Sequence, residues 1–239
     1  MKEVRYFYVP GAANVNELPE EEAAHALRVL RLTEGDEIML MDGEGTFYRA
    51  VIDAADKRHC CYSITEALPQ QRQWNPHLHL AMAPTKNMDR IEWLAEKATE
   101  IGFDELTFLH CQFSERTEVK LPRIDKIIIS AVKQSRKAYR PQLNAMTPFK
   151  DFIRQPFHGD KYICHCYEQE DLQAKLELKD VLQAGHDCVV MIGPEGDFSI
   201  DEVKQAMQAG FVPVSLGKSR LRTETAALVA VHLMNLKTQ

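Results

Sequence analysis

The chain has 239 residues, of which 45% are apolar, and its formal net charge is −6. This length and composition suffice for one large or two small domains with buried cores. The acidic balance argues against a protein that binds nucleic acid over its whole surface, although it leaves room for a local basic face.

The first 70 residues predict short strands and turns around one helix. A helical pattern occupies residues 21–32, and the sequence DGEG at 42–45 is typical of a hairpin turn. The strand-like runs are residues 5–10, 37–42, 46–54 and 59–67. We therefore expect a small β-barrel domain over residues 1–70, followed by a linker that is rich in proline and polar residues.

From residue 75 to residue 239 the pattern changes to apolar runs that alternate with helical segments. The predicted strands are residues 77–83, 105–111, 161–167, 187–193 and 212–217, and the clearest helical patterns are residues 89–101 and 123–139. Alternation of strand and helix predicts an α/β domain with a largely parallel sheet that is covered on both faces.

The sequence IGPEGDFS, residues 192–199, forms a glycine-rich turn between a predicted strand and a predicted helix. Ser199 and Glu202 have the spacing of a capping box at the start of that helix. A phosphate loop would need lysine and a hydroxyl residue after the glycines, whereas Asp197 and Phe198 stand there. The alternatives are a plain tight turn, or a site for a ligand that carries positive charge.

The sequence SLGKSRLRT, residues 215–223, repeats this arrangement of strand, glycine, polar loop and helix. The helix that follows is apolar on most of its circumference, which predicts that it is buried. Ligands of open parallel sheets bind at the carboxyl ends of strands, so the two loops are expected to share one pocket.

GPEGDFS at 193–199 and SLGKSRLRTETAA at 215–227 together resemble the C-terminal signature of the SPOUT-class RNA methyltransferases. Within that class the chain is similar to the ribosomal RNA small subunit methyltransferase E family. The resemblance extends over nearly the whole chain. It includes LAMAPTKNMDRIEWLAEKATEIGFDEL at 80–106, SERTEVK at 114–120, AVKQSRKAYRPQL at 131–143 and HALRVLRLTEGDEIMLMDGEG at 25–45.

The resemblance implies a PUA-like RNA-binding barrel, then a SPOUT domain whose last elements form a deep trefoil knot around S-adenosylmethionine. It also implies a homodimer, and methylation of N3 of a uridine in small-subunit (16S) ribosomal RNA, either free or in the assembled small subunit. Many relatives have a second glycine where this chain has Asp197. The implied cofactor contacts are Ile192, Gly193, Pro194, Glu195, Gly196, Leu216, Gly217, Ser219, Leu221, Arg222 and Thr223.

A basic stretch gives an independent indication of RNA binding. Residues 116–140 contain eight basic and two acidic side chains, several of them at helical spacing, which suits a phosphate backbone. An ordinary solvated helix face is the alternative. The candidate RNA contacts are His25, Arg28 and Arg31 on the helix of the barrel, with Lys86, Arg90, Arg116, Lys133, Arg136 and Arg140 in the rest of the chain.

Methyl transfer to a uracil nitrogen needs correct placement of the base and removal of its proton. Arg222 is the candidate for stabilising the substrate anion, and Glu195 and Glu224 are candidates for accepting the proton. The alternative is that each carboxylate has a purely structural role, as an ion-pair partner of Arg220 or Arg222. Two other functions remain: modification of another RNA or of a ribose 2′-hydroxyl, and RNA binding without catalysis.

Neither a metal nor a membrane is expected. In the sequence CHC at 164–166, strand alternation sends the two thiols to one face and the histidine to the other, which favours thiols in a core. Charges interrupt the first 30 residues, and the apolar window at 226–234 is too short to span a bilayer. Six cysteines without framework spacing indicate reduced thiols, so we expect a cytoplasmic protein.

Overall fold

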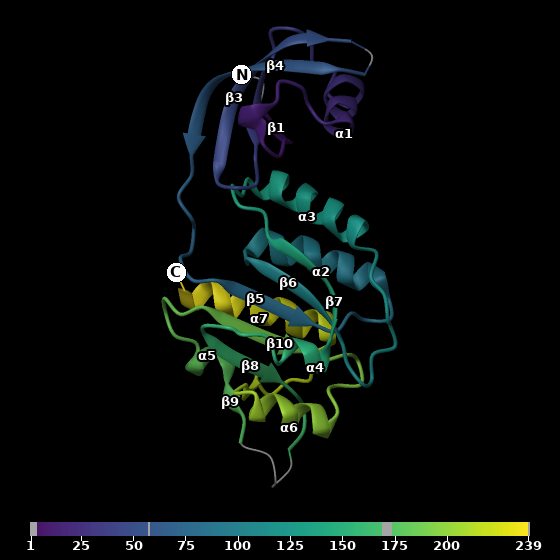
Figure 1. Ribbon diagram of the computed structural model, residues 1–239, viewed down its shortest axis with the longest axis vertical. Coiled ribbons are helices and arrows are strands. Elements are labelled where there is room, and N and C mark those ends of the chain that lie inside the picture. The colour runs from purple at the N-terminus through teal and green to yellow at the C-terminus, as the bar shows by residue number, and fades with distance from the viewer. Residues whose placement is uncertain (1–3, 57, 169–173, 239) are drawn as a thin grey trace. The chain divides into compact units, whose positions relative to one another are not determined.

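The computed structural model describes residues 4–56, 58–168 and 174–238, which divide into two compact units (Figure 1). The first unit contains the chain up to Arg72 together with Ile129–Arg140. The second unit contains Gln73–Ile128 and the chain from Pro141 onward. A segment from the middle of the sequence therefore belongs to the same unit as the N-terminal strands.

The first unit is built on a four-stranded sheet in the order β1-β2-β3-β4. Its strands are β1 (Arg5–Tyr8), β2 (Glu37–Met41), β3 (Thr46–Ala55) and β4 (Cys60–Pro69), and a short 3-10 turn covers Ala12–Asn14. β1 runs parallel to β2, and the other pairs are antiparallel. Phe7, Leu40 and Ile52 are fully buried between this sheet and its helix. All four predicted strands are present.

The predicted hairpin turn between β2 and β3 is confirmed. Asp42 accepts hydrogen bonds from the backbone of Glu44 (2.7 Å) and Thr46 (3.0 Å). Gly45 has φ 114°, and a side chain there would come within 2.5 Å of the Tyr139 ring. Glycine is therefore required both by the backbone conformation and by the aromatic ring packed over it.

The helix predicted over residues 21–32 differs from the observed one. It consists of α1 (Glu20–Ala24) and a π-helical turn at His25–Val29, and Arg31 lies beyond it with φ 55°. The wider turn is visible in the hydrogen bond from Leu30 N to His25 O. The prediction that Arg31 lies on this helix together with His25 and Arg28 was therefore wrong, although all three side chains are exposed.

The second long helix, α3 (Leu121–Ser135), also ends earlier than predicted. Arg136 has φ 51°, which ends the helix, and Lys137 is buried. Lys133 Nζ lies 2.6 Å from Glu22 Oε1. The basic residues of this segment therefore do not form one continuous helical face, because the helix stops and part of the positive charge is already paired.

The second unit contains a seven-stranded sheet, entirely parallel, in the order β7-β6-β5-β10-β8-β11-β9. The strands are β5 (Leu78–Met82), β6 (Glu105–His110), β7 (Gln142–Pro148), β8 (Asp160–Cys164), β9 (Leu176–Glu177), β10 (Cys188–Ile192) and β11 (Val212–Ser215). This confirms the α/β class. The sequence missed the two edge strands, because β7 is polar and half exposed and β9 has only two residues.

Helices cover both faces of this sheet (Figure 1). On one face α2 (Met88–Ile101) packs against α7 (Thr223–Thr238), which also contacts β5 and β10. On the other face α4 (Phe149–Phe152) and α6 (Ile200–Gln208) surround a core that includes Phe149, Phe198 and Val203. The short helix α5 (Leu178–Val181) follows β9. The final helix is thus buried against the sheet, as its apolar composition predicts.

The chain leaves β11 near one edge of the sheet and returns to its centre as α7. A knot formed by the last elements would require such a return of the chain. The trefoil knot itself stays a prediction. Within the described residues, no helix has both the length and the apolar composition to cross a bilayer.

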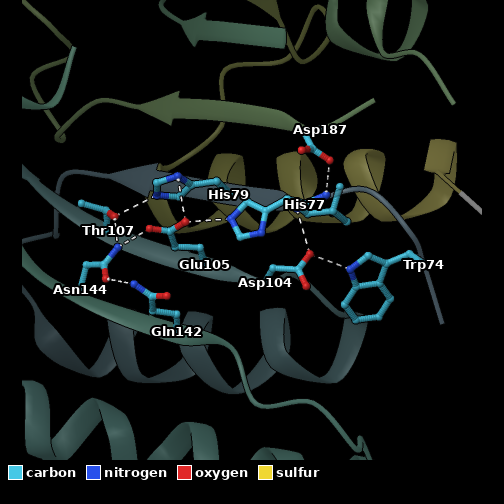
Figure 2. A network of polar contacts seen from close by, with 10 residues as sticks. Trp74, His77, His79, Asp104, Glu105, Thr107, Gln142, Asn144 and Asp187 are labelled. Carbon is cyan, nitrogen blue, oxygen red and sulfur yellow. Dashed lines mark hydrogen bonds and ion pairs between the residues drawn. The ribbon is translucent and has the colours of Figure 1, made fainter. Parts of the chain in front are cut away.

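A polar network joins the amino ends of the central strands (Figure 2). His77 Nε2 lies 2.8 Å from Glu105 Oε2, and the ring of His79 lies 2.8 Å from Thr107 Oγ1. Asp104 accepts hydrogen bonds from the indole of Trp74 (2.7 Å) and from the backbone of Leu78 (2.9 Å). Asn144 of β7 donates to Thr107, and Asp187 accepts from His77 N just before β10. Four strands are therefore held in register by side chains at this edge.

Two histidines in the network have opposite pKa shifts. The hydrogen bond to Glu105 raises the pKa of His77 and lowers the pKa of that carboxyl. Burial lowers the pKa of His79 to about 4, because the interior disfavours its charged form. His79 is therefore neutral at physiological pH, with its ring packed edge-on against Phe152 at 5.5 Å.

Candidate active site

The loops that follow β8, β10 and β11 line one cleft of about 1420 Å³. These three strands are neighbours in the parallel sheet, so their carboxyl ends lie at the same edge. Arg90, at the start of α2, completes one side of the cleft, and Lys175 and Glu177 line another part of it. The cleft thus gathers residues that are as far as 136 positions apart, from Arg90 to Ala226.

The structure brings both glycine loops of the sequence analysis to this cleft. Eleven predicted cofactor contacts line it: Ile192, Gly193, Pro194, Glu195, Gly196, Leu216, Gly217, Ser219, Leu221, Arg222 and Thr223. The side chain of Arg222 is exposed, whereas Thr223 is buried at the first residue of α7.

The first loop is closely packed against the start of α6. A side-chain carbon at Gly193 would lie 2.9 Å from the backbone nitrogen of Phe198, so only glycine fits there. Asp197 has φ 68°, in the left-handed region, and its backbone nitrogen donates to Pro194 O at 2.9 Å. The predicted capping box is confirmed, with reciprocal hydrogen bonds of 2.8 and 3.2 Å between Ser199 and Glu202.

The second loop turns at Gly217, which has φ 120°. The Ser215 hydroxyl accepts a hydrogen bond from Gly217 N at 3.1 Å and so stabilises the turn at the end of β11. After this turn Lys218, Ser219 and Arg220 are exposed. The loop therefore presents its backbone and a group of polar side chains to the cleft.

Both candidate carboxylates lie beside Arg90. Arg90 Nε is 3.6 Å from Glu224 Oε1, and Arg90 Nη1 is 4.0 Å from Glu195 Oε1. Glu195 also accepts a hydrogen bond from the backbone of Lys86 at 3.1 Å. Glu224 is 6% exposed, and its Oε2 has no hydrogen-bond partner among the described residues. The sequence suggested Arg220 or Arg222 as the structural partner, whereas the cation that the structure places between the two carboxylates is Arg90.

The first residues of the loop after β8, 165–168, form a third wall of the cleft, which sequence reasoning did not identify. Cys164, His165, Cys166 and Tyr167 all line it. His165 is 6% exposed, and neither ring nitrogen has a partner among the described residues. Burial lowers its pKa, and the nearby charge of Lys175 acts in the same direction. The prediction that both thiols lie in a core was wrong for Cys166, which is exposed because β8 ends at Cys164.

The nine candidate RNA contacts separate into two groups. Lys86, Arg90 and Arg116 lie together: Arg116 Nη2 donates to Lys86 O at 2.6 Å, and Glu195 contacts both Lys86 N (3.1 Å) and Arg90 Nη1 (4.0 Å). The other six belong to the first compact unit: His25, Arg28, Arg31, Lys133, Arg136 and Arg140.

The cleft suits an extended ligand that is partly apolar and partly polar. Ile192, Leu216 and Leu221 supply apolar surface, and the glycine loops allow close approach of the backbone. The unpartnered atoms of His165 and Glu224 are buried polar groups that a bound ligand would satisfy. In the described parts of the chain, no group of three or more histidine, cysteine or acidic side chains is arranged to hold a metal ion.

Comparison with known proteins places this architecture among RNA-modifying enzymes. The family model for an RNA methyltransferase domain matches residues 72–235, and that for an RNA methyltransferase PUA domain matches residues 18–64. The chain is 31% identical to a ribosomal RNA small subunit methyltransferase E of Synechocystis over 216 residues, which cover 87% of this chain and 68% of the relative.

Solved structures give the same result over nearly the full length. A probable rRNA-methyltransferase from Porphyromonas gingivalis is 42% identical, with a TM-score of 0.91 and 98% of each chain covered. A ribosomal RNA small subunit methyltransferase E from Neisseria gonorrhoeae, solved with S-adenosyl methionine bound, is 27% identical, with a TM-score of 0.84. That alignment covers 99% of this chain and 98% of the other.

Proposed function

Since the chain belongs to the ribosomal RNA small subunit methyltransferase E family, we propose that it transfers a methyl group from S-adenosylmethionine to a uridine of small-subunit ribosomal RNA, at N3. The observation that carries the proposal is the convergence of both glycine loops, with all eleven residues of the implied cofactor site, at one cleft. Known relatives with the cofactor bound support the same assignment.

The residues of the cleft match the needs of the cofactor. Its sulfonium supplies a methyl group that is already activated toward a nucleophile. Backbone groups of the loops at 192–197 and 216–223 would hold the adenosyl and methionyl parts, and the open space beside Gly217 leaves room for them. Glu195 and Glu224 supply negative charge to a ligand with a positive centre, while Arg90 fixes both side chains.

The chemistry at the base requires removal of a proton and stabilisation of the resulting negative charge. Arg222 is exposed at the end of the second loop, so its guanidinium can reach a substrate placed over the cleft. We assign charge stabilisation to Arg222 and proton acceptance to one of the two carboxylates. Glu195 is the more accessible of the two, since 37% of its side chain is exposed, compared with 9% for Glu224.

The remaining assignments concern the partners. We assign RNA binding to the PUA-like domain, residues 1–70, and to Lys86, Arg90 and Arg116 of the methyltransferase domain, residues 75–239. Lys133, Arg136 and Arg140, which the structure groups with the first compact unit, are assigned to the RNA as well. The proposed substrate is free ribosomal RNA or the assembled small subunit, in the cytoplasm. We also propose a homodimer. Trp93 on α2 and Leu236 on α7 are 44% and 57% exposed, and these two helices pack together. Exposed apolar side chains on adjacent helices are typical of a subunit interface.

Sedimentation tests the dimer directly. We expect the purified protein to sediment as a dimer at micromolar concentration, and Leu236→Lys to shift it toward the monomer. A wild-type monomer under these conditions would reject the homodimer.

The reaction itself is tested with labelled S-adenosylmethionine and small subunits from cells that lack this protein. We expect one methyl group per particle, at a uridine where reverse transcription stops, because a methyl at N3 blocks base pairing. Subunits from cells that contain the protein are the matched control and should accept no label. A ribose-methylated product, or transfer only to another RNA, would instead support the other functions that the sequence leaves open.

A further inference from the structure

Two hydrogen bonds tie the loop after β8 to the first glycine loop. Asp197 Oδ2 accepts from the backbone nitrogen of Cys166 at 2.7 Å, and the Tyr167 hydroxyl donates to Phe198 O at 2.7 Å. His165 comes directly before this attachment and lines the cleft. We propose that Asp197 is a positioning residue that holds the loop after β8, so that the His165 imidazole contacts the bound cofactor.

The backbone of Asp197 indicates why its side chain matters. With φ 68° it occupies a conformation that glycine adopts freely and that aspartate adopts at some cost. The carboxylate makes up for that cost, because Oδ1 accepts from Phe198 N at 2.7 Å while Oδ2 reaches Cys166. A glycine would fit the turn equally well and would leave Cys166 N without this acceptor. The function of the carboxylate is therefore to join two walls of the cleft.

His165 is the residue that this attachment orients. The side chain is buried in the cleft with both ring nitrogens unpartnered among the described residues, an arrangement that is costly unless a ligand completes it. Burial keeps the pKa of His165 low, so the ring is neutral near pH 7 and offers one donor and one acceptor. A neutral ring also avoids repulsion of the positive sulfonium. The inference rests on the proposed function only for the identity of the cofactor.

The test measures S-adenosylmethionine affinity by calorimetry for Asp197→Gly, His165→Phe and the double variant. Loss of one hydrogen bond to the cofactor corresponds to about tenfold weaker binding, which we expect for His165→Phe. Asp197→Gly should weaken binding by a similar factor of about ten, because the ring is no longer held in place. The double variant should lose about tenfold rather than about a hundredfold, since both changes remove the same contact.

A conservative variant separates positioning from a structural effect. Asparagine tolerates the left-handed conformation but has a single side-chain oxygen, so it can accept from Cys166 N only if its amide nitrogen replaces the oxygen beside Phe198 N. Asp197→Asn should therefore recover only part of the affinity, with a loss smaller than that of Asp197→Gly. Asp201→Asn, an exposed change on α6, is the control for loss of a nearby charge. In the wild type, adding cofactor should also shift the ring-nitrogen resonances of His165, and Asp197→Gly should reduce that shift.

The outcomes are distinct. Wild-type affinity in Asp197→Gly, or independent losses that multiply in the double variant, would overturn the positioning role. Failure of the proposed function looks different, since the wild type would bind cofactor but methylate no uridine at N3. A wild type that does not bind the cofactor would overturn both.

Discussion

The two edges of the seven-stranded sheet use polar residues in opposite ways. At the amino edge, His77, Glu105 and Asp104 are buried or half buried and bonded to one another or to the backbone. At the carboxyl edge, His165 and Glu224 are buried and have side-chain atoms without a hydrogen-bond partner in the part of the chain that the structure describes, while the backbone of Asp197 is left-handed. Satisfied groups stabilise a fold, whereas unsatisfied groups and unusual backbone conformations are kept where a ligand completes them. The same sheet thus has a structural edge and a candidate binding edge.

This comparison predicts that changes at the carboxyl edge alter chemistry without altering stability. Arg222→Lys keeps the charge but loses the planar fork of donors, so we expect single-turnover methyl transfer to fall on the order of a hundredfold or more. Cofactor affinity should change little, because the contact is made chiefly in the transition state. Arg154→Lys, exposed and outside the cleft, is the control. Near-normal turnover would move the catalytic role elsewhere, and joint loss of rate and cofactor binding would make Arg222 a cofactor-site residue.

At the amino edge, a change of pH should have the largest effect on the free energy of unfolding. The folded protein holds the pKa of His79 at about 4, so between pH 6.5 and that value only the unfolded chain takes up this proton. The free energy of unfolding should therefore fall as the pH falls through this range, by on the order of 3 kcal/mol. His77 acts in the opposite direction, since its raised pKa favours the folded state below its unfolded value, but its side chain is 39% exposed and its effect is smaller.

Urea unfolding at several pH values, in the wild type and in His79→Gln, measures this contribution. The decrease toward low pH should be clearly shallower in the variant, whatever its stability at neutral pH. Identical slopes in the two proteins would show that His79 does not titrate as its burial implies.

A substitution at the same edge tests whether the network affects function. Asp104→Ala leaves the Trp74 indole and the Leu78 amide without their acceptor, so the free energy of unfolding should decrease by about 2 kcal/mol. Cofactor affinity, measured by calorimetry at a temperature where the variant is folded, should stay within about twofold of the wild type, within the scatter of mutational effects between distant sites. A large loss of affinity would mean that the two edges are coupled.

The smallest expected effect concerns RNA. Lys86 lies beyond the carboxyl end of β5 and is exposed. If it contacts a phosphate, Lys86→Gln should make the plot of log affinity against log salt concentration shallower, by about one unit of slope. Lys179→Gln, exposed on α5 and outside the cleft, should leave the slope unchanged. Equal slopes for both variants would remove Lys86 from the RNA contacts.

The sequence predicted features that depend on neighbours along the chain. The capping box at Ser199, the hairpin at Asp42 and the five central strands are local patterns, and the structure contains all of them. The two glycine loops were recognised for the same reason. What the sequence could not supply is the strand order β10-β8-β11, which long-range pairing sets and which brings His165 between the two loops.

Arg90 was missed as a partner of the carboxylates for a similar reason. It is separated from Glu195 and Glu224 by more than a hundred residues, and only the position of α2 beside the cleft brings them together. Helix ends were also misjudged. A helical pattern continues through Arg136 in the sequence, whereas the observed helix ends at Ser135 and Arg136 has a positive φ.

The segment Ile129–Arg140 affects how the chain can fold while it is being synthesised. It completes the first unit, since Tyr139 packs over Gly45, Arg136 stacks on Tyr6 and Lys133 neutralises the buried Glu22. A nascent chain presents its N-terminal strands to the solvent long before residue 140 leaves the ribosome. Those strands therefore remain incomplete while β5 and β6 are being synthesised, and the N-terminal unit cannot finish folding ahead of the rest, as N-terminal domains usually do.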